Sequence, residues 1–193
     1  MKTGTLGAQQ VDVELLRACQ GGDRQAFRVL FEVYRDRVYS IALHFSGNSA
    51  VAADVTQEVF VKLFHAIRQF RFGSDFGTWL YRLVANACMD EHRRRRRWLP
   101  LRDVFMSPSD SQEKTAIRAE VSAAVEAAVA HLAPRLRLLI LLRYVEGLSY
   151  DQIADALGCS KGTVASRLNR AHKLLARRLS HLRSEFPAEG SNV

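Results

Sequence analysis

The stretch LSYDQIADALGCSKGTVASRLNRAHKLL (residues 148–175) predicts two short helices joined by a tight turn. Ser149, with Gln152 three residues later, matches the capping box that begins a helix. Gly158 suits the left-handed position that ends a helix, and Ser160 can cap the next one. The second helix has apolar side chains at the spacing of a buried face: Val164, Leu168, Ala171 and Leu175. This arrangement is typical of a helix-turn-helix.

The face of the second helix opposite this apolar stripe is polar and basic. A helix fits the major groove of duplex DNA, which is about 12 Å wide, and its first residues then reach the base edges. We expect six side chains to contact DNA: Lys161, Thr163, Ser166, Arg167, Arg170 and Lys173. An ordinary helical hairpin with a solvated basic face is the alternative interpretation.

Basic charge is concentrated in two separate parts of the chain. The formal net charge is +8 over 193 residues. Residues 93–102 carry +6 and residues 131–183 carry +7, whereas residues 103–130 between them carry −3. Two basic concentrations divided by an acidic stretch indicate two contacts with one polyanion, such as a nucleic acid.

Helical periodicity extends through most of the remaining chain. Asp23 and Asn48 can each cap a helix whose apolar side chains recur every three or four residues. A weaker helix is expected near residues 12–19, and Pro134 suits the first turn of a helix that reaches about Val145. No segment has the pattern of a credible strand, so the chain is predicted to be all-α.

The helical pattern fails over residues 98–112. This segment holds two of the four prolines and three serines, and proline disfavours a helical conformation of the residue before it. We therefore predict two small helical domains, residues 10–97 and 113–183, joined by a flexible linker over residues 98–112.

The stretch FRFGSDFGTWLYRLVANACMDEHRRRRR (residues 70–97) interleaves aromatic and basic side chains. Unpaired bases expose their faces, and proteins that hold single strands use aromatic surfaces beside basic grooves. The loop that carries Ser74, Asp75 and Thr78 can form a pocket for an extruded base. Core packing is the alternative for aromatic residues at helical spacing, such as Trp79.

Three segments, taken in order, resemble one protein family. DVTQEVFVKLFHAI (residues 54–67) and FGTWLYRLVANACMDEHRRRRR (residues 76–97) resemble region two of bacterial sigma factors, and the helix-turn-helix stretch resembles region four. Their order and spacing over about residues 10–180 resemble an extracytoplasmic-function (ECF) sigma factor, group IV of the primary-sigma superfamily. The resemblance implies two all-α regions and a role in promoter recognition.

The resemblance also implies two contacts with bacterial core RNA polymerase. The residues that match the segment binding the clamp helices of the β′ subunit are Asp54, Gln57, Glu58 and Phe60. Region four of this family contacts the β flap through an apolar surface, for which residues 138–142 are candidates. Core packing is the alternative for Phe60 and for residues 138–142.

Recognition of promoter DNA is divided between the two regions in this family. The residues that match the segment recognising and opening the −10 element are Phe72, Ser74, Asp75, Thr78, Trp79, Asn86, Asp90 and Arg93. The loop within this segment is expected to hold a base flipped from the non-template strand, and Asp90 alternatively orients an arginine. The six side chains of the helix-turn-helix are expected at the −35 element.

Further partners and competing functions follow from the same reasoning. Members of this family are often held inactive by an anti-sigma factor, so such a partner is expected beside core polymerase and promoter DNA. The alternative is a stand-alone helix-turn-helix regulator, which binds duplex DNA without polymerase. We expect no enzymatic activity, because the six histidines form no HExxH pattern and no phosphate-binding GxxxxGK[ST] occurs.

Cofactors, metals and membrane insertion are not expected. Cys19, Cys88 and Cys159 lie far apart without metal-ligand spacing, and are interpreted as small buried side chains. No apolar stretch approaches the roughly 20 residues of a membrane span, and the first ten residues lack the apolar core of a signal peptide. The protein is therefore predicted to be cytoplasmic, with membrane association only through an anti-sigma factor.

Overall fold

The computed structural model describes residues 12–73, 75–98 and 116–180. Over these residues the chain is all-α, as predicted, and the structure contains no strand. The first four helices are α1 (Val13–Gln20), α2 (Arg24–Ser46), α3 (Ser49–Ala66) and α4 (Phe76–Trp98), with a 3₁₀ turn, η1 (Ile67–Gln69), after α3. The other four are α5 (Ala116–Ala130), α6 (Pro134–Ile140), α7 (Tyr150–Leu157) and α8 (Lys161–Arg178).

The helix caps predicted from the sequence are present. Asp23 accepts a backbone N–H of α2 at 2.7 Å, and Asn48 accepts one of α3 at 3.0 Å. Ser149 begins α7 with a complete capping box, and Gly158 ends it with a φ of 62°. These side chains satisfy backbone groups that the first turn of a helix leaves without partners, so local sequence determines where the helices begin.

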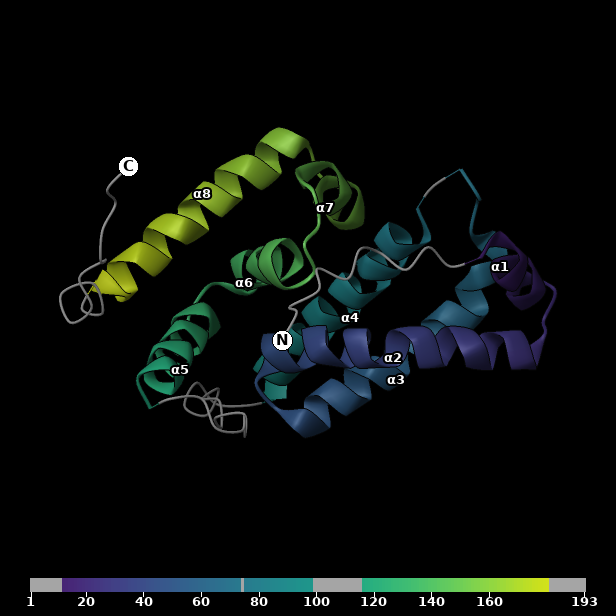
Figure 1. Cartoon of the computed structure of the whole chain (residues 1–193), viewed down its shortest axis with the longest axis horizontal. Coiled ribbons are helices and arrows are strands. Elements are labelled where there is room, and N and C mark those ends of the chain that lie inside the picture. The colour runs from purple at the N-terminus through teal and green to yellow at the C-terminus, as the bar shows by residue number, and fades with distance from the viewer. Residues whose placement is uncertain (1–11, 74, 99–115, 181–193) are drawn as a thin grey trace.

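Helices α1–α4 form one bundle, in which α2 and α3 run back along each other (Figure 1). Each long helix buries the apolar stripe that its spacing predicts, and the largest fully buried side chains include Leu30, Ile41, Leu63, Leu80 and Val84. Burial of each such side chain contributes about 1.5–3 kcal/mol. The bundle therefore gives a rigid support for the outer faces of α3 and α4.

Helices α5–α8 form a second bundle, with one departure from the sequence prediction. The helix that begins at Pro134 was expected to reach about Val145, but α6 ends at Ile140 and the next five residues form a π-helical turn, η2 (Leu141–Val145). The Glu146 N–H closes this turn by donating to the carbonyl five residues earlier, at 3.1 Å. The chain then turns at Gly147, whose φ of 70° lies in the left-handed region that glycine adopts readily.

The two bundles pack against each other, which the sequence did not predict. Helix α7 lies against α4, and α6 contacts both α2 and α4 (Figure 1). Helix α4 extends to Trp98, and the rest of the predicted linker lies outside the described residues. Within the described part of the chain, the two predicted domains form one continuous set of buried apolar side chains.

The contact between the bundles contains a buried carboxylate. The Glu146 side chain is only 5% exposed, and its Oε2 atom accepts a hydrogen bond from the Tyr81 hydroxyl at 2.7 Å and forms an ion pair with Arg37 Nε at 3.1 Å. Burial raises the pKa of Glu146, and burial together with the Glu146 charge raises the pKa of Tyr81. A second link is made by Arg137, whose Nη1 donates to the Phe45 carbonyl at 2.6 Å.

Candidate protein and nucleic-acid interfaces

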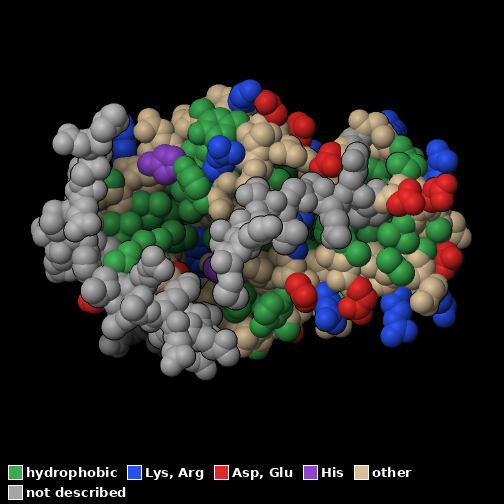
Figure 2. All heavy atoms as spheres, viewed as in Figure 1, with side chains coloured by type: hydrophobic (Ala, Val, Ile, Leu, Met, Phe, Trp, Pro, Cys, Tyr) green, Lys and Arg blue, Asp and Glu red, His purple; other side chains and the backbone are tan. Residues whose placement is uncertain are grey.

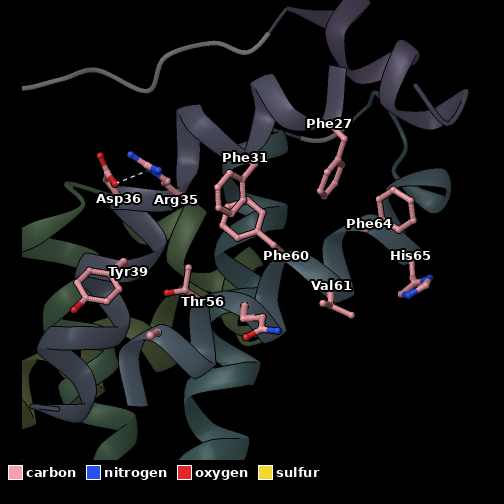
Figure 3. A pocket seen from close by; sticks show the side chains of 12 residues that line it. Phe27, Phe31, Arg35, Asp36, Tyr39, Thr56, Phe60, Val61, Phe64 and His65 are labelled. Carbon is pink, nitrogen blue, oxygen red and sulfur yellow. Dashed lines mark hydrogen bonds and ion pairs between the residues drawn. The ribbon is translucent and has the colours of Figure 1, made fainter. Parts of the chain in front are cut away.

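An apolar groove of about 670 Å³ lies between α2 and α3 (Figure 3). Its lining residues come from both helices: Phe27, Phe31, Arg35, Asp36, Tyr39, Ala53, Thr56, Gln57, Phe60, Val61, Phe64 and His65. Figure 3 shows Phe31 and Phe60 facing each other near its middle, with Phe27 and Phe64 toward one end.

Aromatic pairs form the walls of this groove. Phe31 and Phe60 pack edge to face with ring centroids 4.6 Å apart, and Phe27 and Phe64 do so at 5.1 Å. Phe60 is buried, whereas Phe64 and Val61 are 46% and 51% exposed. Large apolar side chains left exposed in one place are typical of a protein interaction site.

The predicted polymerase-binding residues divide between the groove and its flank. Gln57 and Phe60 line it, whereas Asp54 is exposed outside it and Glu58 pairs with Lys62 at 2.6 Å. Phe60 is packed in the core, as the alternative interpretation expected, and it also lines the groove. Phe27 and Phe31 were missed, because their α2 positions fit an ordinary buried stripe and the facing α3 residues are about 30 positions away.

The loop between η1 and α4 is organised around Asp75. Its Oδ1 accepts the Thr78 N–H at 2.7 Å and the Thr78 hydroxyl at 2.8 Å, so it caps α4. Thr78 is buried, Trp79 is partly buried, and Phe72 is 42% exposed. The predicted base-pocket residues are therefore together at the start of α4, except Ser74, which lies outside the described residues.

The outer face of α4 carries the other residues predicted for the −10 element. Asn86 is exposed, and Arg93 pairs with Asp90 at 3.0 Å. The alternative role of Asp90, orienting an arginine, agrees with this pair. Further along the arginine run, Arg94 and Arg95 both contact Glu91, a mostly buried carboxylate.

Helix α8 presents the residues predicted for the −35 element. Ser160 caps the helix by accepting the Thr163 N–H at 3.2 Å, and Ser166 is exposed. Lys161 pairs with Asp151 of α7 at 2.8 Å. Arg170 and Lys173 are exposed and form no ion pair with any described residue. Arg167 is partly buried at the flank of the same face.

The apolar side chains of α6 do not form an outer surface. Residues 138–142, the candidates for a β-flap contact, are 0–6% exposed, so the core-packing interpretation is correct. Figure 2 instead shows hydrophobic side chains gathered between α5 and α8 on the face drawn there. One large apolar side chain of α5, Val125, is 39% exposed.

Other site chemistry can be described briefly. Cys19 and Cys88 are buried, and burial raises the pKa of Cys88 to about 12, whereas Cys159 is partly exposed rather than buried as expected. Among the residues that the structure describes, no group of three His, Cys, Asp or Glu side chains is placed to hold a metal. None of the described helices has the length and apolar character needed to cross a bilayer.

Comparison with known proteins identifies the two bundles. The family model of Sigma-70 region 2 matches residues 30–98, and the model of Sigma-70, region 4 matches residues 122–175. The chain is 33% identical to the RNA polymerase sigma-H factor of Pseudomonas aeruginosa, covering 92% of this chain and 98% of that protein. It is 34% identical to the ECF RNA polymerase sigma factor SigM of Mycobacterium tuberculosis, covering 90% of this chain and 87% of that protein.

A solved structure agrees with this assignment. The structure of CnrH in complex with the cytosolic domain of CnrY is similar with a TM-score of 0.67 and 26% identity, covering 87% of this chain and 96% of that chain. The relatives match almost the whole chain, and the two family models fall on the two bundles. The chain therefore belongs to the ECF sigma factors, non-enzymatic subunits that bind core RNA polymerase and direct transcription initiation from specific promoters.

Proposed function

We propose that region 2, helices α1–α4, binds the clamp helices of the polymerase β′ subunit through the groove between α2 and α3. An amphipathic helix can place apolar side chains against Phe31, Phe60 and Phe64. Asp54 lies exposed on the flank of the groove and can pair with basic side chains of the partner. The observation that carries this proposal is the exposed apolar surface of Val61 and Phe64.

A charge placed in the groove tests this proposal. Val61→Glu adds a carboxylate to an apolar interface, where an unpaired charge is strongly unfavourable, so binding to core polymerase should fall at least tenfold. Val33→Glu is the matched control, because Val33 is 39% exposed on α2 and does not line the groove. Equal polymerase affinity of the two variants in a binding titration would contradict the proposed surface.

We assign opening of the −10 element to the loop before α4 and to the outer face of α4. Exposed Phe72 offers a ring for stacking on an unpaired base, and Asn86 and Arg93 offer polar contacts along the same strand. Binding of the unpaired strand would offset unstacking, which costs a few kcal/mol per base step. Asp75 and Thr78 support this surface chiefly by capping α4.

We assign recognition of the −35 element to α8. Its exposed face has a capped N-terminus and, further along, Arg170 and Lys173, which pair with no acid among the described residues. Side chains near the start of such a helix reach base edges, whereas cations further along neutralise phosphates. A stand-alone regulator would use the same helix, but it would leave the groove of region 2 without a role.

Simultaneous use of both DNA surfaces requires the two bundles to separate. Elements centred near −35 and −10 are about 25 base pairs apart, which is roughly 85 Å along the duplex at 3.4 Å per step. A compact chain of this length has a radius of gyration of only about 16 Å. The 17 residues between the described parts can reach about 56 Å when fully extended. We therefore expect region 4, helices α5–α8, to leave region 2 on the promoter.

Regulation by an anti-sigma factor in the cytoplasm completes the proposal. The similar protein CnrH was solved in complex with the cytosolic domain of CnrY. A partner that covers Val61 and Phe64 would exclude polymerase from the same groove. Competition between such a partner and core polymerase for the wild-type chain, together with weaker binding of Val61→Glu to both, would assign the partner to this groove.

A further inference from the structure

One side chain of α1 holds the loop that precedes α4. Gln20 is the last residue of α1, and its Nε2 donates to the Ile67 carbonyl at 3.0 Å and to the Phe70 carbonyl at 2.8 Å. A primary amide nitrogen has two hydrogens, so both are used on this loop. Ile67 begins η1 and Phe70 directly follows it, so Gln20 joins α1 to the point where the loop leaves the bundle.

A second side chain of α1 contacts the exposed part of the same loop. The Arg17 guanidinium lies 5.5 Å from the centre of the Phe72 ring. Arg17 and Gln20 are three residues apart and therefore lie on one side of the helix. Helix α1 thus contacts both the start of the loop and the aromatic ring that we assign to the unpaired nucleobase.

The rest of the loop is held from two other directions. Phe70 is buried and packs against the Phe76 ring at 5.4 Å and the Trp79 ring at 5.3 Å. Asp75 caps α4 at the far end. Between these anchors, Arg71, Phe72 and Gly73 are exposed. Phe72 also packs edge to face against the buried Phe70 ring at 5.6 Å, so contact with α1 adds a second hold on this exposed segment.

We infer that Gln20 is a positioning residue for promoter opening, and that Arg17 acts beside it. Gln20 orients the Phe70 carbonyl and so sets the direction in which Phe72 leaves the bundle. Arg17 places a positive charge next to that ring, where a strand whose base stacks on Phe72 brings a phosphate. A loop ordered before binding loses less conformational entropy when the strand binds. This inference rests on the assignment of Phe72 to the unpaired strand.

The test is the affinity of the reconstituted holoenzyme for a single-stranded −10 oligonucleotide. Gln20→Met keeps the length of the side chain but donates no hydrogen bond, and should weaken oligonucleotide binding about tenfold. Gln20→Glu should weaken it further, because its carboxylate faces two carbonyl oxygens. Arg17→Gln should also weaken it and should reduce its salt dependence. Gln25→Met, at an exposed glutamine of α2, is the matched control and should bind as the wild type does.

Further measurements separate positioning from general stability. Affinity for core polymerase and for −35 duplex should stay within about twofold of wild type for Gln20→Met and Arg17→Gln. Because Arg17 is exposed, its variant should fold even if a Gln20 variant does not. Unchanged oligonucleotide affinity in both Gln20→Met and Arg17→Gln, while Phe72→Ala binds weakly, would overturn the inference. Unchanged affinity in Phe72→Ala itself would instead overturn the −10 assignment.

Discussion

Region 2 and region 4 hold the side chains that we assign to DNA in different ways. In region 2, Asp90 pairs with Arg93 at 3.0 Å and Asp75 is bound to Thr78, so these groups have defined positions before DNA arrives. In region 4, Lys161 pairs with Asp151 at 2.8 Å, but Arg170 and Lys173 further along α8 form no ion pair with any described residue. The difference suits the two targets. An unpaired strand is mobile and is best captured by an ordered surface, whereas a duplex is stiff and allows long side chains to adapt to it.

The largest expected effect separates core from interface within region 2. Phe60→Ala removes a buried ring packed against Phe31 and should lower the free energy of unfolding by about 3–5 kcal/mol. Phe64→Ala removes a half-exposed ring and should lower it by only about 1 kcal/mol. Both variants should bind polymerase weakly. Thermal melts are needed to tell loss of stability from loss of a direct contact with polymerase. Strong polymerase binding by a folded Phe64→Ala variant would remove Phe64 from the proposed surface.

The next effect concerns the contact between the two regions. Glu146→Ala leaves Arg37 and Tyr81 without their shared acceptor, and should weaken the packing of region 4 on region 2 by about 3 kcal/mol. Each region keeps its own core, so circular dichroism should stay helical while fluorescence energy transfer between the regions falls. Unchanged transfer would show that Glu146 does not hold the regions together.

The pH dependence of this contact has a defined sign. Burial raises the pKa of Glu146 above 4.5, so its contribution to packing is full below about pH 4.5 and is lost as the pH rises through the raised pKa. Tyr81, Arg37 and His44 oppose this shift by lowering the pKa of the same carboxyl. His92 has a pKa lowered by burial, Arg137 and Arg96, so its own contribution to stability is lost as the pH falls rather than as it rises. Glu146→Gln should keep the hydrogen bond from Tyr81 and remove the pH dependence that Glu146 adds to the packing. Identical pH profiles of energy transfer in wild type and Glu146→Gln would contradict the assignment.

Within region 4, Arg170 and Lys173 should contribute differently to DNA binding, Arg170 to sequence preference and Lys173 to general affinity. Arg170→Ala should weaken −35 binding by about 1–3 kcal/mol and relax a base preference if its contact is bidentate. Lys173→Ala should weaken all sequences about equally and reduce the salt slope by roughly one. Titrations of cognate and scrambled −35 duplexes at several salt concentrations measure both quantities. If Arg170→Ala weakened binding to cognate and scrambled duplexes equally, Arg170 would contact phosphate, as Lys173 is expected to do, and not a base.

The smallest effect concerns the paired cation of α8. Lys161 and Asp151 are both more than 60% exposed, and such pairs contribute about 0.2–1 kcal/mol. Asp151→Asn frees Lys161 and removes a negative charge near the DNA, so −35 affinity should rise slightly at low salt and match wild type at high salt. A loss of affinity at low salt would show that the pair orients Lys161 for its contact.

The sequence predicted those features that depend on near neighbours. The caps at Asp23, Asn48 and Ser149 and the buried stripes follow from residues within one or two turns. The packing between the regions was not predictable in this way, because Tyr81 and Glu146 are 65 residues apart. The same holds for Gln20, whose carbonyl partners lie 47 and 50 residues later. The π-helical turn after Ile140 also has no simple sequence signal.

The candidate surfaces were predicted to different degrees. Most of the residues on α3, α4 and α8 that family resemblance selected are exposed, Asn86 and Arg170 among them. It did not show that Thr78 is buried and bound to Asp75, because a cap and a base pocket both require short polar side chains. The α2 wall of the groove became visible only when α2 and α3 were placed together.

The distance between the two regions tests the central claim most directly. Dyes can be placed at the exposed positions Val33 of α2 and Val125 of α5 as cysteine substitutions, after Cys159→Ser removes a partly exposed thiol. Energy transfer should be high in the free chain, where the regions pack together, and low in a complex with core polymerase and promoter. Equally high transfer in a complex that initiates transcription would contradict the claim that separate regions contact −35 and −10 at the same time.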